Sequence, residues 1–155
     1  MQNLLSLSWK KVSAYALVSA FAIGSILPLS ANAAADDILG EWYNGTKEAK
    51  IQIYKSGSEY SGKIIWLKVP NENGKPKVDD KNPDPAKRNN KTLGLVILKD
   101  FVNTKDNKWE KGTIYDPKNG KEYSCEMTLK TPKVLDVRGY IGFSFIGRTD
   151  TWTRP

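Results

Sequence analysis

The stretch Lys121-Glu-Tyr-Ser-Cys-Glu-Met-Thr-Leu-Lys130 decides the fold class of this chain of 155 residues. From Tyr123 to Leu129, apolar residues stand at every second position, with hydroxyl-bearing or acidic residues between them. A period of two is typical of a β-strand that has one buried face and one face in water. The pattern places Cys125 on the buried face, so we expect an unreactive thiol that is shielded from solvent.

Similar stretches recur on both sides of this strand. Short runs rich in β-branched and aromatic residues alternate with clusters of Gly, Asn, Asp and Pro, and no segment beyond Asp36 carries the longer apolar period of a helix. Asn119-Gly120 predicts a tight hairpin in which both residues take a positive φ. Eight strands are expected, at residues 39–44, 48–55, 59–68, 93–101, 108–115, 121–130, 133–140 and 146–153.

Tight turns between successive strands predict an all-β fold, in which the strands form an antiparallel meander. Eight such strands can close into a barrel, which removes the unpaired edges and leaves an interior for side chains or for one small ligand. An open β-sandwich is the alternative.

Residues 69–91 carry four Pro and almost no apolar residue. We expect this long loop to lie over one end of the barrel like a lid.

The first 33 residues have the pattern of an export signal. Lys10 and Lys11 precede an apolar stretch from Val12 to Leu29, and Ala31-Asn-Ala33 matches the small-x-small site of signal peptidases. We expect cleavage after Ala33, which leaves one mature domain of residues 34–155 without a membrane span. The protein would then be periplasmic or secreted by a bacterium. An uncleaved anchor is the alternative, because an apolar stretch of about eighteen residues can just cross a bilayer.

Composition narrows the classes of function. One Cys and no His exclude a disulfide framework, a cysteine-rich zinc site and a histidine general base, so we expect no metal and no cofactor. Signal cleavage would lower the net charge from +7 to +5, and the lysines form no dense cluster. An anionic lipid, cell-wall polymer or acidic envelope partner is therefore expected, and nucleic acid is not. A hydrolase built on Asp116, Asp136 and Asp150 is the enzymatic alternative.

Motifs spread over residues 38–155 resemble one bacterial family. They are Gly40-x-Trp42, Tyr60-x-Gly-Lys-Ile-Ile-Trp-Leu67, Asp80-x-Asn-Pro-Asp-Pro85, Trp109-x-x-Gly-x-Ile-Tyr-Asp-Pro117, Val137-Arg-Gly-Tyr-Ile-Gly142 and Gly147-Arg-Thr-x-x-Trp-x-Arg154. This set is similar to the bacterial secreted family of unknown function catalogued under number 2147, and it implies a small exported β domain. The opening Gly-x-Trp with a late Arg also resembles lipocalins, in which that Trp lies beneath an Arg of the last strand.

The use of arginine points to special sites, because the chain otherwise uses Lys for positive charge. Arg138, Arg148 and Arg154 are three of only four Arg, and all lie in the last eighteen residues. A guanidinium is a planar fork suited to carboxylates, phosphates and aromatic faces. By the lipocalin resemblance, Trp42 would lie beneath Arg154 or Arg148. Trp152 shares one face of the last strand with both arginines. We therefore expect Trp42, Trp152 and Arg154 to form a structural clasp at the closed end of the barrel. Arg138 and Arg148 are the candidates to bind an anionic group.

The aromatic side chains offer the apolar part of a binding site. Trp66, Trp109 and Tyr115 are the candidates to line it, and packing within the core is the alternative interpretation. In the long loop, Asp79, Asp80, Asn82 and Asp84 carry oxygen ligands, but their spacing fits Asx-Pro turns better than a calcium site.

The leading hypothesis is an exported binding protein for a small amphipathic or anionic ligand, without catalysis. An interaction module of the cell envelope, with its barrel filled by its own side chains, is the alternative.

Overall fold

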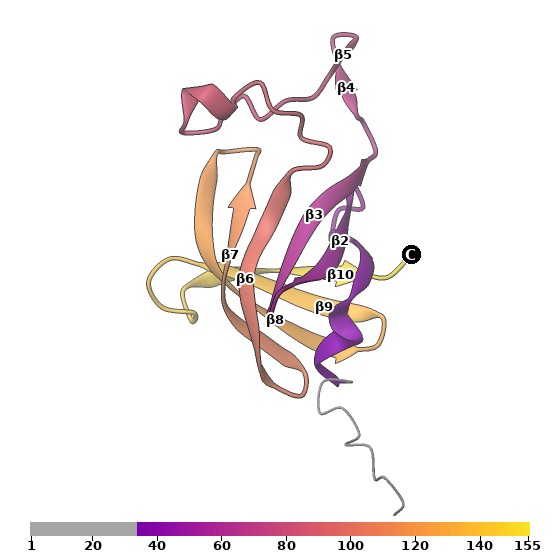
Figure 1. Cartoon of the computed structure of the whole chain (residues 1–155), viewed down its shortest axis with the longest axis vertical. Coiled ribbons are helices and arrows are strands. Elements are labelled where there is room, and N and C mark those ends of the chain that lie inside the picture. The colour runs from indigo at the N-terminus through magenta and orange to yellow at the C-terminus, as the bar shows by residue number, and fades with distance from the viewer. Residues whose placement is uncertain (1–33) are drawn as a thin grey trace, which may run out of the picture.

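The computed structural model, which describes residues 34–155, confirms an all-β fold with a closed antiparallel barrel of eight strands (Figure 1). The strands are β1 (Gly40–Tyr43), β2 (Ala49–Ser56), β3 (Glu59–Leu67), β6 (Val96–Lys105), β7 (Lys108–Asp116), β8 (Lys121–Thr131), β9 (Val134–Tyr140) and β10 (Gly147–Thr153). Each strand pairs with the next along the chain, and β10 returns to pair with β1, which closes the sheet and excludes the open sandwich. The expected signal peptide lies outside the described residues.

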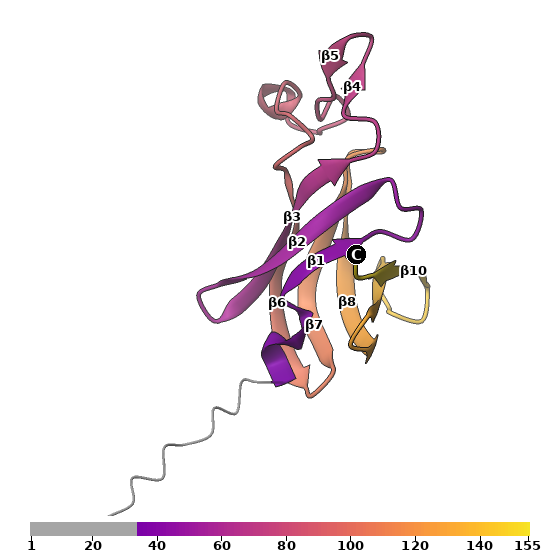
Figure 2. The ribbon, with the colours of Figure 1, turned by 90° about the vertical axis from the view of Figure 1, so that its right-hand side faces the viewer.

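The barrel has two different ends. The closed end carries the short 3-10 helix η1 (Ala34–Ile38) and the tight turns β2–β3, β6–β7 and β8–β9 (Figures 1 and 2). The open end carries four connections, residues 44–48, 68–95, 117–120 and 141–146. Within residues 34–155, η1 and the strands of the barrel bury one shared cluster of apolar side chains, so this part of the chain has a core of its own.

Large side chains fill the interior of the barrel. Trp42, Phe101 and Trp109 are fully buried there. Two glycines mark how tightly the walls approach: a methyl group on Gly112 would collide with the ring of Phe101, and one on Gly62 with Leu98. A closely packed interior of this kind leaves these glycines no room for a side chain.

Strand β8 shows the period of two that the sequence predicts. Cys125 and Met127 are buried, whereas Ser124, the residue before Cys125 in the same strand, is exposed. Cys125 is a free thiol, and burial raises its pKa to about 12. The prediction of a shielded thiol is thus confirmed.

The turn before β8 differs from the prediction. Gly120 has a φ of 71°, but Asn119 is not among the described residues with positive φ. The turn holds four residues rather than two, because the amide of Gly120 donates to the carbonyl of Asp116 at 2.8 Å. The Asp116 carboxylate also accepts from the amide of Lys118, so local side-chain bonds select a wider turn that ends in a left-handed glycine.

The long loop has some structure of its own. It contains a small hairpin of β4 (Asn71–Glu72) and β5 (Lys75–Pro76), and the 3-10 turn η2 (Pro85–Lys87). Figures 1 and 2 show both beyond the open end of the barrel. Within residues 34–155, no helix has the length and apolar character needed to cross a membrane.

Candidate functional site

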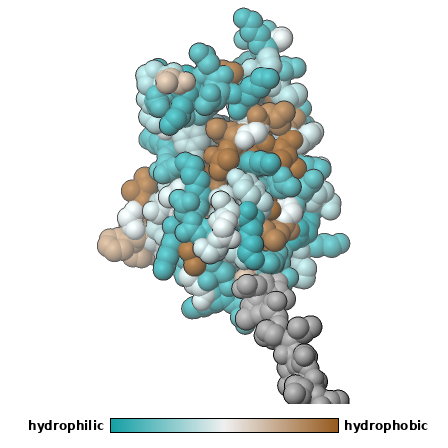
Figure 3. Space-filling view, viewed as in Figure 1, coloured by the Kyte–Doolittle hydropathy of each residue, from teal (hydrophilic) through white to brown (hydrophobic). Residues whose placement is uncertain are grey.

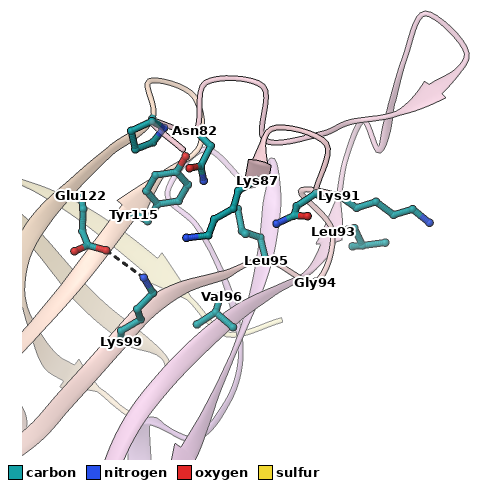
Figure 4. Close-up of a pocket in the computed structure, with 13 residues that line it drawn as sticks. Asn82, Lys87, Lys91, Leu93, Gly94, Leu95, Val96, Lys99, Tyr115 and Glu122 are labelled. Carbon is teal, nitrogen blue, oxygen red and sulfur yellow. Dashed lines mark hydrogen bonds and ion pairs between the residues drawn. The ribbon is translucent and has the colours of Figure 1, made fainter. Parts of the chain in front are cut away.

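A pocket of about 830 Å³ lies between the second half of the long loop and the barrel wall (Figure 4). Its wall side comes from β6, β7 and β8, which contribute Lys99, Tyr115 and Glu122. Gly112 faces the interior against Phe101, so alternation along β7 turns Tyr115 outward. The pocket is therefore built on the outside of the barrel and not in its interior.

Apolar side chains form one part of this pocket. Leu93, Leu95 and Val96, at the end of the loop and the start of β6, line it together with the ring of Tyr115. Figure 3 shows hydrophobic residues gathered on the face just below the hydrophilic loop. Leu93 is still half exposed, so this apolar surface is open to an incoming molecule.

Buried hydrogen bonds fix the loop against the wall. The Tyr115 hydroxyl donates to one carboxylate oxygen of Asp79 at 2.7 Å, and the Asn82 amide donates to the other at 2.6 Å. The backbone amide of Asp79 donates to the carbonyl of Asn90 at 2.9 Å. Burial, and then the bond to Asp79, raise the pKa of Tyr115 to about 12. Since Asp79 is fully buried, these bonds hold the pocket in a preformed shape.

The other oxygen-bearing side chains of the loop serve its own turns. Asn82 accepts from the amide of Asp84 at 2.9 Å, and Asp84 accepts from the amide of Ala86 at 3.0 Å. These are Asx turns, of the type that the Asn-Pro and Asp-Pro pairs favour. Among the residues that the structure describes, no three His, Cys, Asp or Glu side chains are placed to share a metal ion.

Three lysines and one glutamate stand around the pocket. Lys99 pairs with Glu122 at 3.2 Å, and Lys87 pairs with Asp84 at 3.3 Å. Lys91 has no ion pair within residues 34–155. Exposed ion pairs such as these are weak, so their lysines can turn to a competing anion. The arrangement can hold a molecule with an apolar part and an anionic group.

The structure does not bring the five expected ligand-binding residues together. Tyr115 lines the pocket, but Trp109 is fully buried in the core, with its ring edge-on to Tyr60. Trp66 lies on the outer wall, edge-on to Tyr43. Its partner in β2 is Lys50, whose neighbour Ile51 faces the interior, so Trp66 points away from the barrel interior.

The two arginines proposed for an anion have different surroundings. Arg138 donates to the carbonyl of Ser144 at 2.6 Å and of Phe145 at 3.3 Å, and to the Thr149 hydroxyl at 2.9 Å. Its guanidinium is thus used to hold the 141–146 connection. Arg148 is exposed at the start of β10, and no hydrogen bond or ion pair engages it within the described residues.

The three residues of the expected clasp lie at two levels of the barrel. Arg154 stacks on Trp42, with its guanidinium carbon 4.2 Å from the ring centroid. Trp152 is buried as well, but its indole donates to Asp150 at 2.7 Å, away from this stack.

The carboxylates of the hydrolase hypothesis do not converge. Asp116 is engaged in its own turn, and Asp136 accepts from Thr151 at 2.8 Å. Asp150 belongs to the opposite face of the sheet, because its neighbour Thr151 is the partner of Asp136.

The sequence interpretation missed most of the pocket. Its lysines and its apolar residues are Lys87, Lys91, Lys99, Leu93, Leu95 and Val96. The one available signal was Leu93-Gly-Leu-Val96, a short apolar run that directly follows a polar loop. Nothing in that run shows that the loop would fold back over the outer wall.

Comparisons with known proteins agree with the architecture. The family model described as "Uncharacterized protein conserved in bacteria (DUF2147)" matches residues 40–154. Among solved structures, the chain is similar to a protein from the human pathogen Helicobacter pylori that is described as belonging to the lipocalin family. The two share 20% identity with a TM-score of 0.68, over 76% of this chain and 82% of the other, a likeness of fold alone. No curated protein matches the chain.

Proposed function

This chain belongs to the bacterial family DUF2147, and on that premise we propose that it is an exported, periplasmic protein that binds a small amphipathic anion. The ligand occupies the pocket between the long loop and β6–β8. Its apolar part lies on Leu93, Leu95 and Val96, and its anionic group meets Lys91. The protein binds without catalysing a reaction.

One observation carries this proposal: exposed lysines surround an apolar pocket whose shape is fixed in advance. Lys87, Lys91 and Lys99 surround it, and the buried bond between Tyr115 and Asp79 holds the loop in place. Pockets for small molecules are mostly apolar, with a few polar groups that fix orientation. The lipocalin-like fold supports small-molecule binding in general. The packed interior directs the search for the ligand to the outside of the barrel.

Two measurements test the proposal. Native mass spectrometry of the protein purified from its own cell envelope should show a retained mass beyond that of the chain. In parallel, residues 34–155 should enhance the fluorescence of 1-anilinonaphthalene-8-sulfonate, an anionic amphiphile. We expect Leu93→Ser or Lys91→Gln to weaken binding of this probe by about fivefold, since each removes about 1 kcal/mol of contact.

The matched control is Lys130→Gln. Lys130 is an exposed lysine of β8 near the closed end. Its substitution therefore removes the same charge as Lys91→Gln, but far from the pocket. If Lys130→Gln weakens probe binding as much as Lys91→Gln does, the effect of Lys91→Gln comes from the net charge and not from the pocket. An unchanged affinity in both Leu93→Ser and Lys91→Gln would place any binding elsewhere.

A further inference from the structure

The connection between β9 and β10 exposes an unusual amount of apolar surface. Its large side chains are 63% to 76% exposed, and they are Ile141, Phe143, Phe145 and Ile146. Figure 1 shows this connection, residues 141–146, extending from the side of the barrel, and in Figure 3 the same region carries hydrophobic colour. Single exposed apolar residues are ordinary, but four in one short loop mark a surface that another body covers.

This loop is held in shape. Arg138 donates to the carbonyls of Ser144 and Phe145, and the amide of Ile146 donates to the carbonyl of Phe143 at 3.0 Å. The rings of Phe143 and Phe145 stack with their centroids 5.5 Å apart. Backbone groups that leave water without a partner cost free energy, so these internal bonds prepare the tip of the loop for a medium without water.

Along the chain, the charges nearest the loop have one sign, and Glu126, which lies opposite Arg138 in β8, already pairs with Lys108 at 3.2 Å. From Val137 to Thr149 there are two Arg and no Asp or Glu. Arg148 is exposed directly beside the loop. The next acid along β10 is Asp150, whose carboxylate already accepts from the Trp152 indole and the amide of Gly45. A body that covers this loop therefore meets apolar side chains beside a positive charge, which is complementary to an anionic surface.

We infer that residues 141–146 are a docking loop for an anionic phospholipid membrane. The four apolar side chains enter the boundary between headgroups and acyl chains, and Arg148 meets a lipid phosphate. Apolar insertion combined with attraction to anionic headgroups is how short elements lie on a bilayer without crossing it. The loop does not line the pocket, so this inference stands apart from the proposed function.

Vesicle flotation of residues 34–155 tests the inference. Vesicles of phosphatidylglycerol and phosphatidylcholine should carry the protein, and vesicles of phosphatidylcholine alone should carry much less. The double variant Phe143→Ser/Phe145→Ser should lose binding by more than about tenfold, because two rings no longer leave water. Arg148→Gln should weaken binding by about fivefold and reduce its dependence on salt.

Val69→Ser is the matched control, because Val69 is also an exposed apolar residue but lies in the other long loop. It should bind vesicles like the unaltered chain. The inference fails if anionic vesicles do not carry the protein, or if the double serine variant floats as well as the unaltered chain. It also fails if sedimentation shows a dimer that the double variant dissolves, since the loop would then join two copies of the chain.

Discussion

The closed end and the open end of this barrel use the same residue types in opposite ways. At the closed end, Trp42 donates to the carbonyl of Ile38 at 2.8 Å, and Arg154 covers its ring while it donates to the carbonyls of Leu39 and Asp37. At the open end, aromatic rings and Arg148 face solvent. The difference indicates that the closed end stabilises the fold, so that the open end can carry binding surfaces.

The largest effect that this comparison predicts is that of Trp42→Ala. Trp42 is fully buried, so the change should lower the free energy of unfolding by about 3–5 kcal/mol. Phe143→Ala, at the open end, should change it by less than about 0.5 kcal/mol. Urea denaturation followed by circular dichroism measures both values. Equal losses in the two variants would mean that stability is not concentrated at the closed end.

The middle of the barrel can be tested by pH. Burial raises the pKa of Cys125 to about 12, whereas an unfolded chain releases the same proton near about 8.5. Above pH 8.5 only the unfolded state loses the proton, so stability should fall by about 1.4 kcal/mol per pH unit until the folded pKa is reached. Denaturation at pH 8 and pH 10 should show this fall. Cys125→Ala should show a flatter dependence, and an identical slope would mean that the thiol is open to solvent.

Arg154→Lys should lower the free energy of unfolding by about 1–2 kcal/mol. Lys keeps the charge, but it loses the planar group that stacks on Trp42 and reaches the carbonyls of Leu39 and Pro132. In a domain of this size the melting temperature should fall by several degrees. Binding of the fluorescent probe per folded molecule should stay the same. A loss of probe affinity would connect the closed end to the pocket.

These contacts show how far sequence reasoning reached. The alternation in residues 121–130 was sufficient for the fold class, because one buried face forces a period of two on any such strand. The resemblance of the Gly-x-Trp motif and the late arginine to lipocalins predicted the stack of Arg154 on Trp42, which the structure contains. Asn119-Gly120 misled the turn prediction, since the bond from Lys118 to Asp116 competes with a two-residue turn.

The pocket could not be predicted in the same way. Periodicity assigns a side chain to one face of a strand, but it does not say what covers that face. Tyr115 faces outward and is nevertheless buried, because Asp79 reaches it from a position 36 residues away in sequence. Such a contact depends on how the long loop folds back, and local sequence patterns carry little information about that.

Tyr115→Phe should have a moderate effect that is confined to the open end. The change leaves one oxygen of the buried Asp79 carboxylate without its donor, which costs about 1–3 kcal/mol. Hydrogen exchange should quicken at the amide of Asp79, which donates to Asn90, and not at amides of the closed end. Probe affinity should fall with it, because the loop no longer holds the pocket. Exchange that quickens evenly along the chain would contradict a local role.

The smallest expected change in stability separates the two arginines beside the docking loop. Arg148→Gln should alter the free energy of unfolding by less than about 0.5 kcal/mol, because nothing within the described residues engages its guanidinium. Arg138→Gln removes the same charge, but it also removes the donors to Ser144 and Phe145, so it should cost about 1 kcal/mol.

The same pair separates charge from loop order in membrane binding. Both variants should float less well with anionic vesicles, since each lacks one positive charge near the lipid. Arg138→Gln should lose more membrane binding than Arg148→Gln. Its docking loop is no longer held in shape, so ordering the loop at the membrane costs free energy. If the two variants bind equally, the contacts that Arg138 makes with the loop do not prepare it for docking. The attraction of the protein to anionic vesicles would then come from its net charge. The difference in binding between each variant and the unaltered chain should disappear at high salt, because salt screens that charge.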